Sequence, residues 1–188
     1  QETDPYMFDF SLSILDSAKL NFETQLYFAN NSQVLQNEQI EKALKKVDIF
    51  LINPVDRLGA FALIKKIKTT NKPVIFFNRE PLERDLSLYE NAYYVGAKPE
   101  QSGELQATLI MNLFGNNPQN LNHFDRNQDG KIQIFILKGE QGHQDAEART
   151  NAVLQTFADS GWIIDLLDIE IANWNRDEAY TKTGRFLS

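Results

Sequence analysis

The sequence contains no cysteine among its 188 residues. This absence excludes disulfide bonds, thiol nucleophiles and zinc sites built from cysteine. Positive charge is also scarce: 19 lysines and arginines stand against 26 aspartates and glutamates, so the formal net charge is −7. Nucleic-acid backbones and anionic membrane surfaces attract basic patches, so an acidic chain is a poor partner for either. No apolar run approaches the roughly 20 residues that a membrane-spanning helix requires.

The signatures of common enzyme classes are missing as well. The sequence has no nucleophile elbow, no P-loop and no GxGxxG motif, and it has only two histidines. A glycosidase with two carboxylates beside the scissile bond is the remaining enzyme alternative, and steady release of reducing sugar from disaccharides would reveal it. We therefore predict no catalytic residue and do not expect the chain to be an enzyme.

Apolar residues make up 42% of the chain, which is enough for a packed core. Short apolar segments that are typical of strands lie at 25–30, 48–53, 73–78, 92–97, 132–139 and 162–173. Segments with helical periodicity lie between and around them, at 6–20, 32–47, 56–71, 99–115, 143–161 and 175–188. Strands that are apolar throughout and alternate with helices indicate parallel sheets covered on both faces. The predicted class is α/β with doubly wound parallel sheets.

A polar connection at 112–118, which ends in Pro118, suggests that the chain forms two lobes. We predict a first lobe at 1–111, a hinge or linker at 112–118 and a partial second lobe at 119–188. The chain starts with a helix that no strand precedes, and the second lobe has few strands. Because the first strand of a doubly wound sheet is usually internal, we expect this strand and much of the second lobe to be absent from this chain. Truncation and a permuted chain order would both give this pattern.

The stretch DRNQDGKIQIFI at 125–136 begins like a calcium-binding loop and then departs from the pattern. Oxygen ligands are available at the usual positions, with Gly130 at the turn; they come from Asp125, Asn127, Asp129, the Lys131 carbonyl and Gln133. The last position, which requires a bidentate glutamate, is Ile136. The loop by itself leaves two interpretations open: an incomplete calcium site, or a turn rich in Asp and Asn before a strand.

Several polar and aromatic side chains lie near predicted strand ends. Asn78 ends the strand 73–78, at the edge where α/β sheets bind ligands, although it could simply cap a turn. Asp145 and Arg149 are four residues apart and share a helix face, where an ordinary surface ion pair is the alternative.

Four further candidates have equally plain alternatives. His143 could be a loop histidine, and Trp174 could pack at the edge of a lobe. Asp4 and Tyr6 precede the first helix, where they could act as a helix cap and a hydrophobic staple.

The segments FFNREP, NAYYVGA, DRNQDGKIQ, LKGEQGHQDAEART and ANW together resemble the periplasmic sugar-binding proteins, in particular those for glucose and galactose. The resemblance runs from about Thr3 to Ser188. It implies the two-lobe type I fold of periplasmic binding proteins, which hold a monosaccharide between the lobes. It also implies a periplasmic protein that delivers sugar to a membrane ABC permease and, in some members, to a chemotaxis receptor, and it leaves a lipid anchor open.

The resemblance also implies a role for each candidate residue. Tyr6 and Trp174 resemble the two rings that sandwich the pyranose, and the rim contacts correspond to Asp4, Asn78, His143, Asp145 and Arg149. Planar Asp, Asn and Arg groups suit the hydroxyls of the rim, and aromatic rings suit the C–H faces. The five oxygen ligands of the loop resemble a structural Ca²⁺ site that a glutamate beyond Ser188 completes. The sequence departs from the family pattern at two positions. Tyr6 stands where the family more often has Phe, and Arg79 stands where it commonly has Lys.

The resemblance does not decide between transport and sensing, so a sugar-sensing receptor ectodomain is the alternative function. A regulator of the LacI type shares the lobe fold, but the acidic charge, the calcium loop and the missing helix-turn-helix argue against it. Glucose and galactose differ at one hydroxyl, and the sequence does not separate them.

Overall fold

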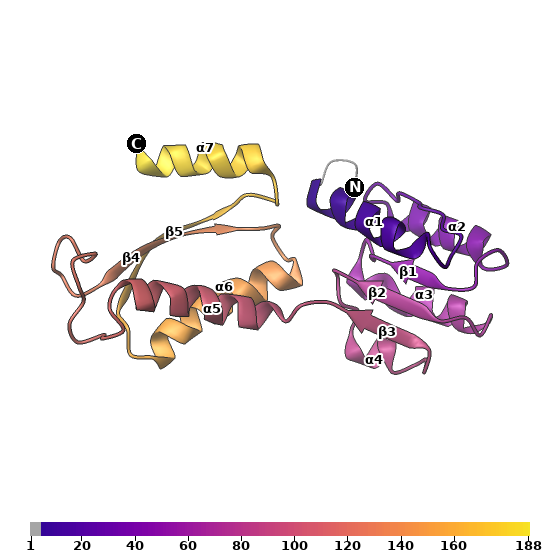
Figure 1. Ribbon diagram of the computed structural model, residues 1–188, viewed down its shortest axis with the longest axis horizontal. Helices are drawn as coiled ribbons and strands as arrows, with labels where there is room; N and C mark the ends of the chain where they lie inside the picture. The colour runs from indigo at the N-terminus through magenta and orange to yellow at the C-terminus, as the bar shows by residue number, and fades with distance from the viewer. Residues whose placement is uncertain (1–4) are drawn as a thin grey trace. The chain divides into compact units, whose positions relative to one another are not determined.

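The computed structural model describes residues 5–188, and it confirms the predicted α/β class with parallel sheets. The chain divides between Ala97 and Lys98 into two compact units. Each unit has its own sheet and its own apolar core (Figure 1). No helix in the described part of the chain is both long enough and apolar enough to cross a membrane.

The first unit is a three-stranded parallel sheet with helices packed on it. Its strands, in the spatial order β1-β2-β3, are β1 (Phe50–Ile52), β2 (Val74–Phe77) and β3 (Ala92–Val95). Its helices are α1 (Pro5–Ala18), α2 (Gln33–Ala43), the short 3₁₀ helix η1 (Arg57–Gly59), α3 (Ala60–Lys68) and α4 (Glu83–Leu86). Sequence signals explain several boundaries; for example, Ser32 caps α2 by accepting a hydrogen bond from the Leu35 N–H, 3.2 Å away.

The core of the first unit lies between α3 and the sheet. Leu63, Ile64 and Ile67 recur at helical spacing, so they line one face of α3, and all three are buried. They belong to the same cluster as Val74 and Phe76, whose side chains point to one face of β2 because strand residues alternate.

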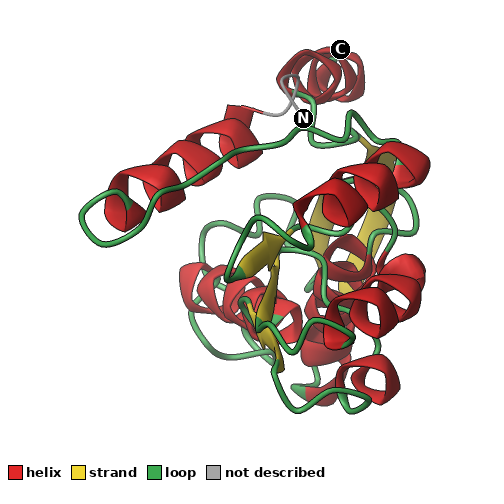
Figure 2. Cartoon of the chain, turned by 90° about the vertical axis from the view of Figure 1, so that its right-hand side faces the viewer, coloured by secondary structure: helices red, strands yellow, loops and turns green. Residues whose placement is uncertain are grey.

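The predicted strand at 25–30 is wrong, since this segment forms no strand. In Figure 2 the chain after α1 runs back along that helix as a loop. An isolated segment cannot form a strand, because its backbone groups need a neighbouring strand to pair with. β1 has a strand neighbour on one side only among the described residues, and its Leu51 is 51% exposed.

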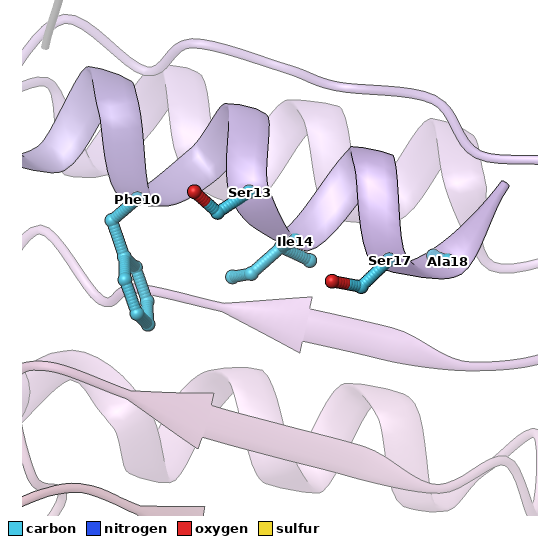
Figure 3. A pocket seen from close by; sticks show the side chains of 5 residues that line it. All are labelled: Phe10, Ser13, Ile14, Ser17 and Ala18. Atoms are coloured by element: carbon cyan, nitrogen blue, oxygen red, sulfur yellow. The ribbon is translucent and has the colours of Figure 1, made fainter.

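A pocket of about 390 Å³ lies along α1 of the first unit. Figure 3 shows the five lining side chains on one face of this helix, with a strand below them; they are Phe10, Ser13, Ile14, Ser17 and Ala18. Packing against the sheet therefore leaves part of this mostly apolar face of α1 open.

The second unit has two parallel strands, β4 (Ile132–Lys138) and β5 (Ile164–Ile171). Its helices are α5 (Pro99–Leu113), α6 (Gln144–Asp159) and α7 (Arg176–Leu187). The core combines Ala107 and Met111 of α5 with Phe157 of α6 and with Ile132 and Trp162.

The structure corrects the predicted boundary at 112–118. Helix α5, which we assigned to the first lobe, belongs to the second unit because Ala107 and Met111 lie in its core. The polar residues after α5 close a turn, in which the Asn116 N–H donates to the Met111 carbonyl at 3.0 Å. A polar stretch with proline marks a turn as readily as a linker.

Candidate functional site

The carboxyl ends of β4 and β5 bring His143 and Trp174 together. The two strands are parallel, so the loops after Lys138 and after Ile171 leave from the same edge of the sheet. The His143 and Trp174 rings meet edge to face, with centroids 5.5 Å apart and planes at 81°. Two side chains that we predicted from the sequence therefore form one wall at this edge.

Backbone and packing constraints fix both rings. His143 is the N-cap of α6, and its Nδ1 accepts a hydrogen bond from the Asp145 N–H at 3.2 Å. Trp174 has a left-handed backbone with φ of 57°. A Cβ atom at position 139 would overlap the Trp174 indole, so only glycine fits beneath the ring. Gly139 was not among the predicted residues, although a glycine directly after a strand was a usable signal.

Polar atoms without partners mark the first two turns of α6. Arg149 Nη2 lies 3.7 Å from Asp145 Oδ2, so the two side chains form a loose ion pair at i, i+4. Three atoms in this segment are buried yet have no hydrogen-bond partner among the described residues: Gln144 Oε1, Asp145 Oδ1 and Arg149 Nε. Leaving a buried polar group unpaired costs about 1–3 kcal/mol, so such a cluster is unusual outside a binding site. Sequence reasoning missed Gln144.

The corresponding edge of the first unit carries Asn78. This residue follows β2 with a left-handed backbone, φ 61°, which asparagine tolerates better than most residues. Its Nδ2 donates to Asn53 Oδ1 at 3.3 Å, and Asn53 directly follows β1. Tyr94 Oη donates to the Asn78 carbonyl at 3.2 Å. Asn78 is thus held at the carboxyl edge, as predicted.

Tyr6 lies in the first turns of α1 and is 71% exposed. Its ring stacks on Phe10, with centroids 6.2 Å apart and planes at 10°. The ring centroid of Phe10 in turn lies 5.7 Å from that of Phe77, the residue before Asn78. The aromatic chain therefore leads from Tyr6 to the end of β2. The predicted sugar contact Asp4 lies outside the described residues.

The loop at 125–133 folds around its two aspartates. Asp129 accepts from the Lys131 N–H at 2.9 Å, from Gln133 Nε2 at 3.0 Å and from Asn127 Nδ2 at 3.0 Å. The Gly130 N–H donates to Asp125 Oδ2 at 3.0 Å, while Asp125 Oδ1 is buried and has no partner among residues 5–188. The backbone hydrogen bond from Lys131 is the main reason why the pKa of Asp129 lies below its ordinary value. Four of the five predicted ligand positions thus lie in this loop, Gln133 lies at the start of β4, and Asp129 stays charged.

This donor set fits a hard cation in part. The oxygens of two carboxylates, two amides and a carbonyl suit Ca²⁺, and the orphaned Asp125 Oδ1 is an atom that a cation would satisfy. Asn127 and Gln133 turn their amide nitrogens toward Asp129, so half-turns of both amides would be needed to present oxygen. No group of three or more His, Cys, Asp or Glu that could hold a metal occurs in the described part of the chain.

Comparisons with known proteins agree on one family. The family model described as "Periplasmic binding protein domain" matches residues 16–188. A relative from Haemophilus influenzae, the D-galactose/methyl-galactoside binding periplasmic protein MglB, is 40% identical over 161 residues, which are 85% of this chain and 47% of that protein. The chain thus spans about half the length of this curated relative.

Solved structures share the fold at lower identity. The periplasmic component of the arabinose ABC transporter from Shewanella sp. ANA-3 superposes with a TM-score of 0.78 at 20% identity, covering 98% of this chain and 56% of that one. A periplasmic solute binding protein from Actinobacillus succinogenes with bound D-allose gives 0.76 at 21% identity, covering 97% and 60%. At these identities the likeness shows the fold alone.

Proposed function

The chain belongs to the periplasmic binding protein domain family, and we propose that it serves to bind a monosaccharide, D-glucose or D-galactose, in the periplasm. This family consists of binding proteins, not enzymes. The 40% identity to a protein named for binding D-galactose and methyl-galactoside supports the choice of sugar.

The observation that carries the proposal is the set of unpaired atoms at the start of α6. Gln144 Oε1 and Asp145 Oδ1 can each accept a hydrogen bond, whereas Arg149 Nε can donate one, and all three lack a partner among the described residues. A sugar hydroxyl both donates and accepts, so neighbouring hydroxyls of one pyranose match this mixture. Because each unsatisfied group costs about 1–3 kcal/mol, a sugar that lacks a matching hydroxyl would be rejected.

The rings next to these atoms suit the apolar faces of the same ligand. Trp174 is 44% exposed and braced edge-on by His143, so it presents an aromatic surface beside the polar cluster. We assign Tyr6 and Asn78 of the first unit to the sugar as well. Asn78 stands at the carboxyl edge of this unit's sheet, and the Tyr6 ring is linked to that edge through Phe10 and Phe77. Asp4 keeps the sugar-contact role that the resemblance gives it.

The proposed partner in the membrane is the permease of an ABC transporter. The relatives support this, because the Shewanella and Actinobacillus proteins are described as periplasmic parts of ABC transporters. A chemoreceptor is a second proposed partner, which comes from the family resemblance alone. Sugar would shift the protein toward the conformation that binds it more tightly, and the permease would recognise that conformation.

We also propose that the loop at 125–133 holds a structural Ca²⁺. When bound, the ion would give Asp125 Oδ1 the positively charged partner that it lacks among the described residues. It would also attract the amide oxygens of Asn127 and Gln133. Ca²⁺ at a hundred times its dissociation constant would stabilise the second unit by about 2.7 kcal/mol. Melting the chain in EDTA and in millimolar CaCl₂ or MgCl₂ tests this, and equal melting temperatures in all three would contradict the calcium site.

Calorimetric titration of the chain with D-galactose and with D-glucose tests sugar binding. Asp145→Asn removes the charge of a proposed contact, and Asp159→Asn makes the same change at the other end of α6 as a matched control. We expect Asp145→Asn to weaken binding about tenfold or more, because hydrogen bonds to charged groups contribute about 1.5–3 kcal/mol. A folded chain that gives no saturable heat with either sugar, or equal affinities for the two variants, would contradict the proposal.

A further inference from the structure

A partly buried ion pair joins the end of β4 to the first turns of α6, next to the candidate site. Lys138 ends β4, and its Nζ donates to Glu147 Oε2 at 2.6 Å. The other carboxylate oxygen, Oε1, accepts the Gly142 N–H at 3.0 Å. We propose that Lys138 and Glu147 position the loop 139–143, and through it His143 and Trp174, for ligand binding. The inference rests on the function proposed above.

The geometry makes Glu147 a bridge between three elements. It lies in the first turns of α6, holds the strand end through Lys138, and holds the loop through Gly142, whose backbone is left-handed at φ 77°. The loop 139–143 is thereby fixed at both ends, and it carries the two residues on which the aromatic wall depends. His143 caps α6, and Gly139 supports the Trp174 indole.

The strand end also holds the Trp174 loop from its other side. The Lys138 carbonyl accepts the Ala172 N–H at 2.8 Å, and the Ala172 carbonyl accepts the Asn175 N–H at 2.7 Å. Trp174 lies between these two points on the chain. A shift at Lys138 would therefore reach the His143 loop through Glu147 and the Trp174 loop through Ala172.

The burial of Lys138 makes the pair sensitive to the loss of Glu147, which would leave the ammonium group unpaired. The Lys138 side chain is only 10% exposed, whereas that of Glu147 is 38% exposed. The Lys138 ammonium, followed by the Gly142 N–H, lowers the pKa of Glu147 below its usual value. An amide at position 147 could not serve both neighbours, because its NH₂ group would face the ammonium whenever its oxygen accepted from Gly142. One of the two bonds would break.

The tautomer of His143 reports the loop position without any ligand. Its Nδ1 accepts from the Asp145 N–H, so the neutral ring carries its proton on Nε2. The chain has two histidines, and a His123→Asn variant assigns their signals. We expect ¹⁵N NMR of the imidazoles to show the Nε2–H form of His143 in the wild type and a tautomer mixture in Glu147→Gln. Glu41→Gln removes a charge from the ion pair with Lys66 in the other unit and should leave the signal unchanged.

A merely structural role would lower the melting temperature without altering the tautomer of the folded protein. Lys138→Arg keeps a cationic donor and should retain the wild-type ¹⁵N signal of His143. Lys138→Met should not retain it. Lys138→Met also replaces Glu147→Gln if that variant fails to fold. A folded Glu147→Gln or Lys138→Met protein with the wild-type His143 signal overturns the proposal.

Sugar titration of the same variants separates this inference from the proposed function. We expect Glu147→Gln to weaken sugar binding roughly two- to thirtyfold, the range for residues that act without touching the ligand. A wild type that binds no sugar would refute the proposed function, yet the tautomer experiment would still decide the positioning role. A weakened affinity together with an unchanged tautomer would also count against positioning.

Discussion

Replacing Gly103 with alanine should drive α5 and α6 apart. Gly103 lies in the first half of α5, directly against the backbone of α6. An added Cβ would overlap the Arg149 carbonyl oxygen and would stand 2.7 Å from the Ala152 Cβ. Neither atom belongs to the end of a flexible side chain, so one helix must move. Arg149 is a proposed sugar contact, and the shift would therefore disturb the candidate site as well.

Two opposing terms set the size of the effect. Overpacking a filled core costs about 1–3 kcal/mol. Exchanging glycine for alanine inside a helix gains about 1 kcal/mol. The free energy of unfolding should thus fall by about 0–2 kcal/mol in Gly103→Ala. Gly184→Ala in α7 is the matched control, since it has the same helical gain and no atom within 4 Å of the new Cβ.

The difference between the two variants isolates the steric term, which we expect to be about 1–3 kcal/mol. Urea unfolding followed by circular dichroism measures it, and thermal melting should show about 4–8 °C for each kcal/mol in a unit of this size. If Gly103→Ala gained as much stability as Gly184→Ala, the close approach of α5 and α6 would be refuted.

Four other changes have defined outcomes. Gly139→Ala should displace the Trp174 indole and weaken sugar binding by about 0.5–1.5 kcal/mol in a titration, with a changed tryptophan emission. Asn78→Ala should cost about 1–2 kcal/mol of stability relative to Asn78→Gly in urea melts, because alanine disfavours a φ of 61°, while both variants should lose sugar affinity. The lowered pKa of Glu147 stabilises the fold above the usual carboxyl pKa of 4.5, so the stability gap between wild type and Glu147→Gln should be present at pH 7 and shrink as the pH falls to 3. Asp125→Ala should abolish any rise in melting temperature that CaCl₂ produces, whereas Asp9→Ala in the first unit should not.

Local signals predicted most of the elements. The apolar stripe of α3 and the Ser32 cap of α2 depend on neighbours within a few residues, so the sequence was enough to place them. The same holds for apolar strands such as β2. No helix was predicted between the strands at 73–78 and 92–97, where α4 lies, since a four-residue helix has too few positions to show a period.

Non-local contacts account for the failures. The segment 25–30 has the composition of a strand, but a strand also requires a partner, which no local pattern reveals. The boundary at 112–118 was wrong because Ala107 and Met111 find their core partners on α6 and β4, far along the chain.

Only part of the candidate site could be predicted, because some of its contacts join residues that are distant in the sequence. The structure brings together His143, Asp145, Arg149 and Trp174, which the family resemblance had singled out. The Lys138–Glu147 bridge joins a strand end to a helix, and it emerges only when both are placed in space.

A crystal structure of this chain with D-galactose would test the central claim most directly. The claim is that the unpaired atoms at the start of α6 exist to bind sugar hydroxyls. We predict sugar oxygens within about 3.2 Å of Asp145 Oδ1 and Arg149 Nε, with the pyranose against Trp174. A bound sugar elsewhere on the chain, with both atoms still unpaired, would contradict the account.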